Sequence, residues 1–281
     1  MTPVPVREND TCAHAPSAQT TRAASLRGRG LVVGYGKGDP VLDDVDLDVL
    51  DTELTVIVGP NACGKSTLLR ALARVLAVQG GEVLLDGTDI MRQGARRVAR
   101  RLGMLPQSPT APEDILVEDL VARGRYPYQG LIRQWGQEDE RAVDAAMSAA
   151  GVSALAGRSV RELSGGQRQR VWIAMALAQE TDLLLLDEPT TYLDLAHQLE
   201  VLDLAARLHR EGRTVVAVLH DLHLAFRYAT HLVVMKDGAV VAQGPTRQVV
   251  TAELVEQVFD VPCRIITDPE SGTPIVVPLS R

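Results

Sequence analysis

The chain has 281 residues, enough for one or two domains, and a hydrophobic content of 46%, which suffices for a packed core. Its formal net charge of −7 argues against nucleic acid as a main partner, because nucleic-acid-binding proteins usually present a strongly basic face. No apolar run approaches the roughly eighteen residues that span a bilayer. The start of the chain has no signal-peptide pattern. The cysteines, Cys12, Cys63 and Cys263, form no metal-binding spacing, so we expect a reducing, cytosolic compartment.

The first quarter of the chain predicts a tail followed by strands. Residues 1–27 are polar, with prolines and scattered charges, and predict a disordered N-terminal tail. Leu31–Val33 and Val41–Val49 are expected strands, and the second alternates apolar and charged residues as a half-exposed strand does. Glu82–Gly87 predicts another strand that ends in a turn. The arginines that follow are expected on the solvated face of a helix; they are Arg92, Arg96, Arg97, Arg100 and Arg101.

A phosphate-binding loop lies between a predicted strand, Leu54–Val58, and a predicted helix, Thr67–Leu76. The loop fits the pattern G-x-x-x-x-G-K-[ST] and consists of Gly59, Pro60, Asn61, Ala62, Cys63, Gly64, Lys65, Ser66 and Thr67. Backbone N–H groups of such a loop point at phosphate oxygens. Lys65 adds a charge near the β- and γ-phosphates, and Ser66 offers a hydroxyl to Mg²⁺. The sequence therefore predicts a nucleoside triphosphate site.

A helical segment interrupts the strand pattern in the middle of the chain. Leu102–Pro106 predicts a buried strand that ends at Gln107. Residues 115–161 instead carry alanine-rich amphipathic patterns, such as Asp139–Ala150, and predict a helical insertion. Apolar runs typical of parallel strands return at Leu183–Leu186 and Thr214–Leu219.

Two hairpins are expected near the C-terminus. His231–Met235 and Ala239–Gln243 flank Asp237-Gly238, a strong hairpin turn. A second hairpin is expected around Asp268–Gly272, in the segment that closes the chain.

Two carboxylates, Asp187 and Glu188, directly follow the buried run Leu183–Leu186. In open α/β sheets ligands bind at this end of the strands. Asp187 suits Mg²⁺, through water, and Glu188 can polarise the water that attacks a γ-phosphate. The alternative is an ordinary acidic strand end, which the preceding phosphate loop disfavours.

The pentapeptide Leu163–Gln167, Leu-Ser-Gly-Gly-Gln, completes a pattern that resembles the ATP-binding cassette (ABC) ATPases, the motor subunits of ABC transporters. The resemblance runs from about Leu31 to Gln243. It implies an α/β P-loop NTPase core with a mainly parallel sheet, an antiparallel β subdomain and an α-helical insertion. We place the ATPase domain at residues 28–250, with the insertion at about 115–161. Residues 251–281 form a C-terminal helix and hairpin extension.

The resemblance also implies roles for single residues. Tyr35 stacks on adenine, Gln107 contacts Mg²⁺ and the attacking water, and His220 contacts the γ-phosphate. Another loop lies at the start of a helix and grips the γ-phosphate that is bound to a second copy of the chain. It contains Ser164, Gly165, Gly166 and Gln167. Asp194 belongs to the loop that links the two sites of a head-to-tail dimer. The other histidines, His197 among them, match no motif and are interpreted as surface or packing residues.

Two loop residues, Ala62 and Cys63, add expectations of their own. Ala62 stands where the family commonly has glycine, and costs roughly 1 kcal/mol if the position needs a positive φ. Cys63 lies near a helix N-terminus and Lys65, which both favour a reactive thiolate. The alternative is a small buried filler, and the sequence leaves both possibilities open.

Three further segments, Arg123–Tyr128, Thr191–Asp194 and Val258–Val261, resemble the importer branch that handles ferric siderophores, haem and cobalamin. This implies a peripheral subunit on the cytosolic side of the membrane, joined to permease subunits and acting indirectly with an extracytoplasmic substrate-binding protein. Iron–siderophore import is the preferred reading, with cobalamin or haem as alternatives. The remaining alternative is a soluble ABC ATPase that is not coupled to transport, as in iron–sulfur cluster assembly.

Arginine and tyrosine are enriched at protein interfaces, so Arg123–Tyr128 is interpreted as part of the groove that receives a permease helix. The alternative is that these side chains cap a helix and pack on the core.

Overall fold

The computed structural model describes residues 24–36, 38–112, 114–130 and 135–280. Residues 1–23 of the predicted tail lie outside the described residues. The predicted end of the tail, at residue 27, is wrong. Strand β1 (Leu26–Val33) begins inside the predicted tail. It pairs on one side with β2 (Leu42–Val49) and on the other with β4 (Gly80–Leu85). The side chain of Leu26 is fully buried, so burial and pairing on both edges order a segment whose glycines and arginines gave little strand signal.

The larger sheet has six strands, and all but the edge strand β10 run parallel. Its order is β10 (Ala239–Pro245), β9 (His231–Lys236), β3 (Leu54–Val58), β8 (Thr214–Val218), β7 (Leu183–Asp187) and β6 (Leu102–Leu105). Every residue of β3, β7 and β8 is buried, as expected for strands that are covered on both faces. The predicted hairpin at Asp237-Gly238 is confirmed by the β9–β10 pair.

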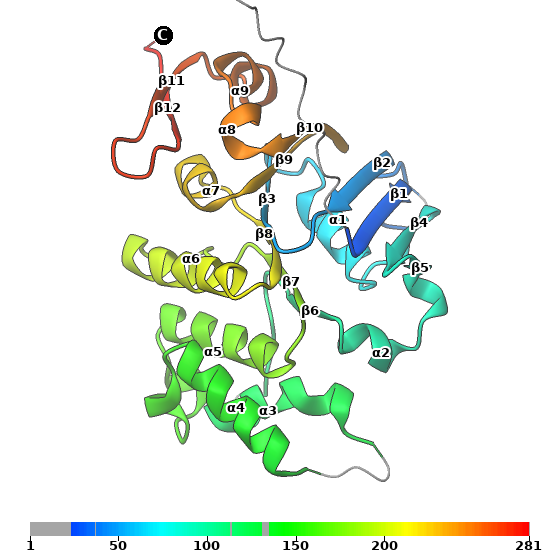
Figure 1. The fold of residues 1–281 in the computed structure, drawn as a ribbon, viewed down its shortest axis with the longest axis vertical. Coiled ribbons are helices and arrows are strands. Elements are labelled where there is room, and N and C mark those ends of the chain that lie inside the picture. Colours follow the sequence, from blue (N-terminus) through cyan, green and yellow to red (C-terminus); the bar gives the residue numbers. More distant parts are fainter. Residues whose placement is uncertain (1–23, 37, 113, 131–134, 281) are drawn as a thin grey trace, which may run out of the picture.

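The smaller sheet is antiparallel, and helix α1 (Lys65–Leu72) lies between it and the larger sheet (Figure 1). Its order is β2 (Leu42–Val49), β1, β4 (Gly80–Leu85) and β5 (Thr88–Asp89). The apolar face of α1 packs in one buried cluster with both sheets, through Leu68, Leu69 and Leu72. The helix that follows the phosphate loop is therefore fixed from two sides.

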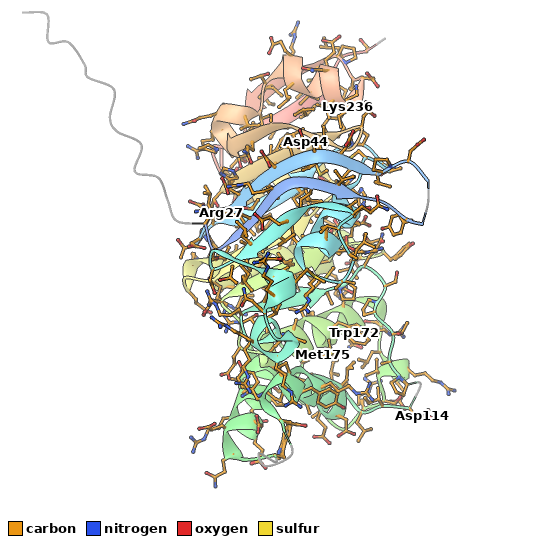
Figure 2. All side chains as sticks on the ribbon, turned by 90° about the vertical axis from the view of Figure 1, so that its right-hand side faces the viewer. Arg27, Asp44, Asp114, Trp172, Met175 and Lys236 are labelled. Atoms are coloured by element: carbon orange, nitrogen blue, oxygen red, sulfur yellow. The ribbon has the colours of Figure 1, made fainter. Side chains whose placement is uncertain are left out.

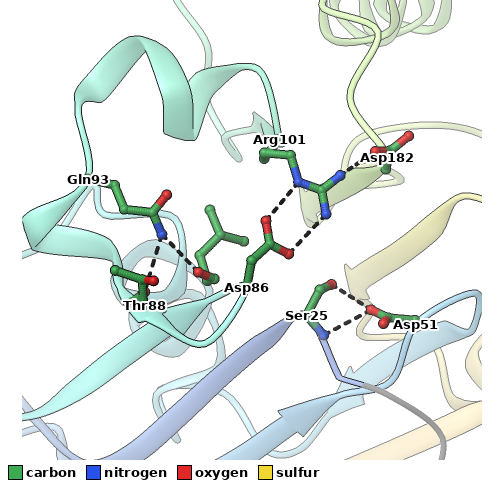
Figure 3. Close-up of polar contacts among 8 residues, drawn as sticks. Ser25, Asp51, Asp86, Thr88, Gln93, Arg101 and Asp182 are labelled. Carbon is green, nitrogen blue, oxygen red and sulfur yellow. Dashed lines mark hydrogen bonds and ion pairs between the residues drawn. The ribbon is translucent and has the colours of Figure 1, made fainter.

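Arg101 joins the smaller sheet to the larger one (Figure 3). Its guanidinium donates to both oxygens of Asp86, at 2.9 and 3.0 Å, and to Asp182, just before β7. These bonds lower the pKa of Asp86. Arg100 donates to the Pro127 carbonyl at 3.1 Å. The expectation of a solvated helix face is therefore wrong for Arg101, which is half-buried and lies beyond helix α2 (Ala95–Ala99). Arg100, the C-cap of α2, is exposed as expected.

The helical part forms the lower end of the molecule in Figure 1, where Figure 2 places Trp172 and Met175. Its elements are α3 (Val117–Ala122), the 3-10 turn η2 (Arg123–Tyr128), α4 (Gln137–Ala149), two further 3-10 turns, η3 (Ser153–Leu155) and η4 (Val160–Glu162), and α5 (Gly165–Ala178). A backbone bridge between Leu116 and Ser159 brings the two ends of the helical segment together. Its start and end therefore lie side by side.

The remaining helices cover the larger sheet and close the chain. They are α6 (Leu195–Arg210), α7 (Leu222–Tyr228), α8 (Thr246–Val249) and α9 (Ala252–Phe259). The 3-10 turn η1 (Ile90–Arg92) instead follows β5 and contacts β4 of the smaller sheet. The second predicted hairpin is confirmed by β11 (Cys263–Thr267) and β12 (Pro274–Pro278), which pair antiparallel. In the described part of the chain no helix combines the length and apolarity needed to cross a membrane.

Candidate functional site

The phosphate loop runs from the end of β3 to the start of α1 and encloses the Lys65 ammonium. Lys65 Nζ donates to the carbonyls of Gly59 at 2.9 Å and Pro60 at 2.7 Å, and the residue is only 4% exposed. A Cβ on Gly59 would lie 2.2 Å from the Met235 carbonyl oxygen, and Gly64 has a φ of +99°. Both glycines are therefore required by the loop's shape, which holds a buried cation at the N-terminus of a helix.

Ala62 has a φ of +61°, so its position does require the positive φ at which alanine is costlier than glycine. A left-handed backbone costs an L-residue about 1 kcal/mol relative to glycine. The loop therefore carries a small local strain at a position that lines the pocket described below.

Cys63 fills space beneath the loop rather than facing solvent. It is 5% exposed, and its Sγ lies 3.9 Å from Lys65 Nζ. Burial raises the pKa of the thiol, and this outweighs the opposing effect of the Lys65 charge. The structure therefore favours the buried filler over the reactive thiolate that the sequence left open.

Maleimide should consequently label Cys63 slowly at neutral pH, in a variant whose other cysteines are replaced (Cys12→Ser, Cys263→Ser). The neutral thiol is a poor nucleophile, so the labelling rate should rise as the pH increases toward the raised pKa. Mass spectrometry after timed labelling measures this, and denaturation in guanidinium supplies the fully accessible reference. Fast native labelling that bound ATP blocks would restore the reactive-thiolate interpretation.

Ser66 and Asp187 meet at the start of α1. Ser66 Oγ donates to Asp187 Oδ1 at 2.6 Å, and Asp187, at the end of β7, is fully buried. Arg70 also contacts Asp187, at 3.3 Å, and the sequence analysis missed it. Arg70 lies four residues after Ser66 in α1, hence on the same helix face, and that spacing was the available signal.

Glu188, which directly follows β7, is held by side chains that follow two other strands and by Thr191 of its own loop. Its Oε1 lies 2.6 Å from His220 Nε2, which follows β8, and its Oε2 accepts from Gln107 Nε2, which follows β6, at 2.6 Å. Thr191 Oγ1 donates to the same Oε2 at 3.1 Å, a contact that sequence reasoning missed. Glu188 has a φ of +53°, a strained backbone typical of functional sites. These contacts fix the carboxylate in place beside the phosphate loop.

A pocket of about 290 Å³ opens between the phosphate loop and these groups. Its lining consists of Tyr35, Val41, Ala62, Gly64, Lys65, Ser66, Thr67, Glu188 and His220. Tyr35 is 55% exposed, with its hydroxyl 3.3 Å from Thr67 Oγ1. The structure therefore gathers most of the predicted nucleotide residues, and Gln107 and Asp187 join them through Glu188 and Ser66.

The remaining predicted residues lie elsewhere. Ser164 caps α5: its Oγ accepts from the Gln167 backbone at 3.3 Å, and the Gln167 side chain accepts from the Ser164 backbone at 3.1 Å. Asp194 caps α6 by accepting from the His197 backbone at 3.0 Å. Neither Asp194 nor the signature loop (Ser164–Gly166) lines the pocket around Lys65. Gln167 acts here as a capping residue.

A phosphate loop lies between the parallel strand β3 and a helix, and a fixed carboxylate follows β7, another parallel strand of the same sheet. Together they define a P-loop nucleotide hydrolase. The sequence profile of the family described as ABC transporter matches residues 42–191. The chain is 53% identical over 263 residues to the ferric enterobactin transport ATP-binding protein FepC of Escherichia coli (strain K12), covering 93% of this chain and 97% of that protein. The chain therefore belongs to the ABC transporter family, as an ATP-binding subunit that hydrolyses ATP.

Solved structures agree with this fold. One is an inward-facing metal-chelate type ABC transporter, which is 29% identical with a TM-score of 0.78 over 92% of this chain and 98% of that one. Another is the dimeric structure of MJ0796, a bacterial ABC transporter cassette, 27% identical with a TM-score of 0.71 over 79% of this chain and 99% of that one. The predicted fold class is confirmed.

Proposed function

We propose that this chain is the ATP-hydrolysing motor of an importer for iron–siderophore complexes. The observation that carries the hydrolytic role is the Glu188 carboxylate, held between Gln107 and His220 beside the phosphate loop. A fixed carboxylate there can accept the proton of a water that attacks a γ-phosphate. The cargo rests on the similarity to the E. coli ferric enterobactin protein and to the metal-chelate type transporter.

We propose that Mg²⁺ accompanies ATP at Ser66, Asp187 and Gln107. A hydroxyl, a carboxylate and an amide carbonyl are the oxygen ligands that this cation takes, together with phosphate and water. Gln107 must point its amide nitrogen at Glu188, since a carboxylate only accepts, which leaves its carbonyl oxygen for a cation. When bound, the ion neutralises charge that develops on the phosphates.

We propose that ATP joins two copies head to tail. Ser164 and Gly165 are exposed at the N-terminus of α5 and do not line the pocket around Lys65 of their own chain. Backbone N–H groups at a helix start favour an anion, and the γ-phosphate of a second copy supplies one. The dimeric structure of the related cassette supports this arrangement. Hydrolysis removes the shared γ-phosphate and lets the copies part.

We propose that permease subunits dock on the helical part, but Arg123–Tyr128 contributes less than its sequence suggested. Arg125 is 2% exposed and pairs with Asp139 at 2.9 Å. Tyr128 lies against Arg125, whose guanidinium is 4.0 Å from the ring centre. These two residues pack on the core, as the alternative interpretation held. Tyr126 is 58% exposed and remains a candidate contact.

Tyr126→Ala should therefore weaken permease binding and lower cargo uptake, while the isolated subunit keeps its basal ATPase activity. Co-purification of the tagged subunit with its permease and uptake of radioactive iron measure the two effects. Met91→Ala, which removes another half-exposed apolar side chain from the antiparallel part, is the matched control. Normal co-purification and uptake with Tyr126→Ala would exclude this residue from the docking surface.

The cargo is tested in a strain that lacks the wild-type subunit and carries either the wild-type gene or a Glu188→Gln copy. We expect the wild-type gene alone to restore uptake of ⁵⁵Fe-siderophore. Restoration of haem or cobalamin uptake instead would identify one of the alternative cargoes. Failure to co-purify with any membrane protein would favour the soluble ATPase, as in iron–sulfur cluster assembly.

A further inference from the structure

We propose that His197 is a positioning residue that holds the signature loop and Asp194 in a fixed relation within one chain. The proposal rests on the proposed function, in which both segments act at the nucleotide of a second copy. His197 lies in the first turn of α6, and the sequence assigned it no role. Its imidazole ring contacts Asp194 through Nδ1 and lies beside Gly166 with Cδ2 and Cγ.

The first contact is with Asp194. His197 Nδ1 lies 2.6 Å from Asp194 Oδ1, and the His197 backbone N–H donates to the same oxygen at 3.0 Å. These bonds lower the pKa of the Asp194 carboxyl, although that side chain is exposed. Asp194 is thus held in one orientation at the start of α6, with the imidazole as its side-chain partner.

The second contact is with Gly166. A Cβ on Gly166 would lie 2.4 Å from His197 Cδ2 and 2.7 Å from its Cγ. Gly166 belongs to α5 and has no positive φ, so its backbone does not demand glycine. A Cβ on its neighbour Gly165 would meet nothing within 4 Å. Within this chain the requirement for glycine at 166 therefore comes from the imidazole ring, which lies directly on the signature loop.

A further link lies about one helical turn along the same pair of helices. Arg170 of α5 and Glu200 of α6 form an ion pair at 2.7 Å. Arg170 lies four positions after Gly166, and Glu200 lies three positions after His197. The ion pair and the Gly166–His197 contact therefore align the starts of α5 and α6. Figure 1 shows α5 and α6 as neighbouring layers. The signature loop and Asp194 then move as one unit when two copies meet, and their relative placement depends on His197.

The contact between Gly166 and His197 is tested by a double-mutant cycle of ATPase activity. Gly166→Ala alone should abolish most turnover, because the new methyl group collides with the ring. His197→Ala alone should lower kcat about 10- to 100-fold, as small misplacements of catalytic groups do. Since His197→Ala makes room for the methyl group, the double variant should be no worse than His197→Ala. Effects that simply multiply would overturn the proposal.

A second test separates positioning from folding. His197→Ala should lower kcat and leave the affinity of the isolated subunit for a fluorescent ATP analogue within about twofold. His197→Asn, whose amide can keep the bond to Asp194, should recover part of the lost kcat. His223→Ala, which removes an exposed histidine of α7, is the matched control. An unchanged kcat with His197→Ala, or no recovery with His197→Asn, would contradict the proposal.

The two proposals can fail separately. Light scattering should show an ATP-dependent dimer of Glu188→Gln, and adding His197→Ala should weaken that dimer. If Glu188→Gln forms no dimer with ATP and Mg²⁺, the proposed head-to-tail function fails. The other outcome is that Glu188→Gln does form the dimer, that adding His197→Ala leaves this dimer unchanged, and that His197→Ala alone leaves kcat unchanged. That outcome refutes only the role of His197.

Discussion

Replacing Glu188 with glutamine is expected to stop ATP turnover and leave ATP binding intact. The amide keeps the size of the carboxylate but cannot accept a proton from water. General-base catalysis contributes about 10²- to 10⁴-fold to the rate of a catalysed reaction, so the rate of hydrolysis should fall by about that factor. The substitution leaves the phosphate loop untouched, because Lys65 bonds to the Gly59 carbonyl and Ser66 bonds to Asp187. With hydrolysis blocked, the ATP-bound dimer should persist.

Phosphate release measures turnover, a fluorescent nucleotide measures binding, and light scattering with ATP and Mg²⁺ measures the dimer. Glu211→Gln, which makes the same chemical change at an exposed position after α6, controls for loss of charge. A Glu188→Gln protein that hydrolyses ATP at the wild-type rate would refute the role of this carboxylate.

The phosphate site could be predicted in detail because its determinants are local. The loop from Gly59 to Thr67 follows a buried strand and leads into a helix, and this order is visible along the sequence. Asp187 and Glu188 were predictable for a related reason, since parallel strands end at a common edge and the ends of β6, β7 and β8 converge there.

The parts that could not be predicted depend on contacts between distant residues. The role of His197 requires knowing that α5 and α6 pack with Gly166 against the ring, and nothing near His197 in sequence indicates this. Thr191 has the same difficulty, because its bond to Glu188 depends on the path of a loop. Cys63 was undecided because the local charge and the burial act on its pKa in opposite directions, and only the structure shows that burial dominates.

Arg125 is the case in which composition misled most, because an arginine beside tyrosines resembles an interface residue. Its charge is instead compensated inside the helical part. Nε donates to Asp139 at 2.9 Å, and Nη1 donates to Glu180 at 2.6 Å and to the Ala178 carbonyl at 2.8 Å. Asp139 is 1% exposed and also accepts from the Gly136 backbone at the start of α4. The arginine therefore connects η2, α4 and the end of α5.

Arg125→Met should lower the free energy of unfolding by about 3–5 kcal/mol, because it leaves the buried Asp139 carboxylate without its cation. Urea denaturation followed by circular dichroism measures the loss. Arg141→Met, the same chemical change at an exposed position of α4, should change stability by less than about 0.5 kcal/mol, as surface substitutions do. Arg125→Met with Asp139→Leu should recover part of the loss, since it removes both buried charges. If Arg125→Met is as stable as the wild type, the ion pair is not what holds the helical part together.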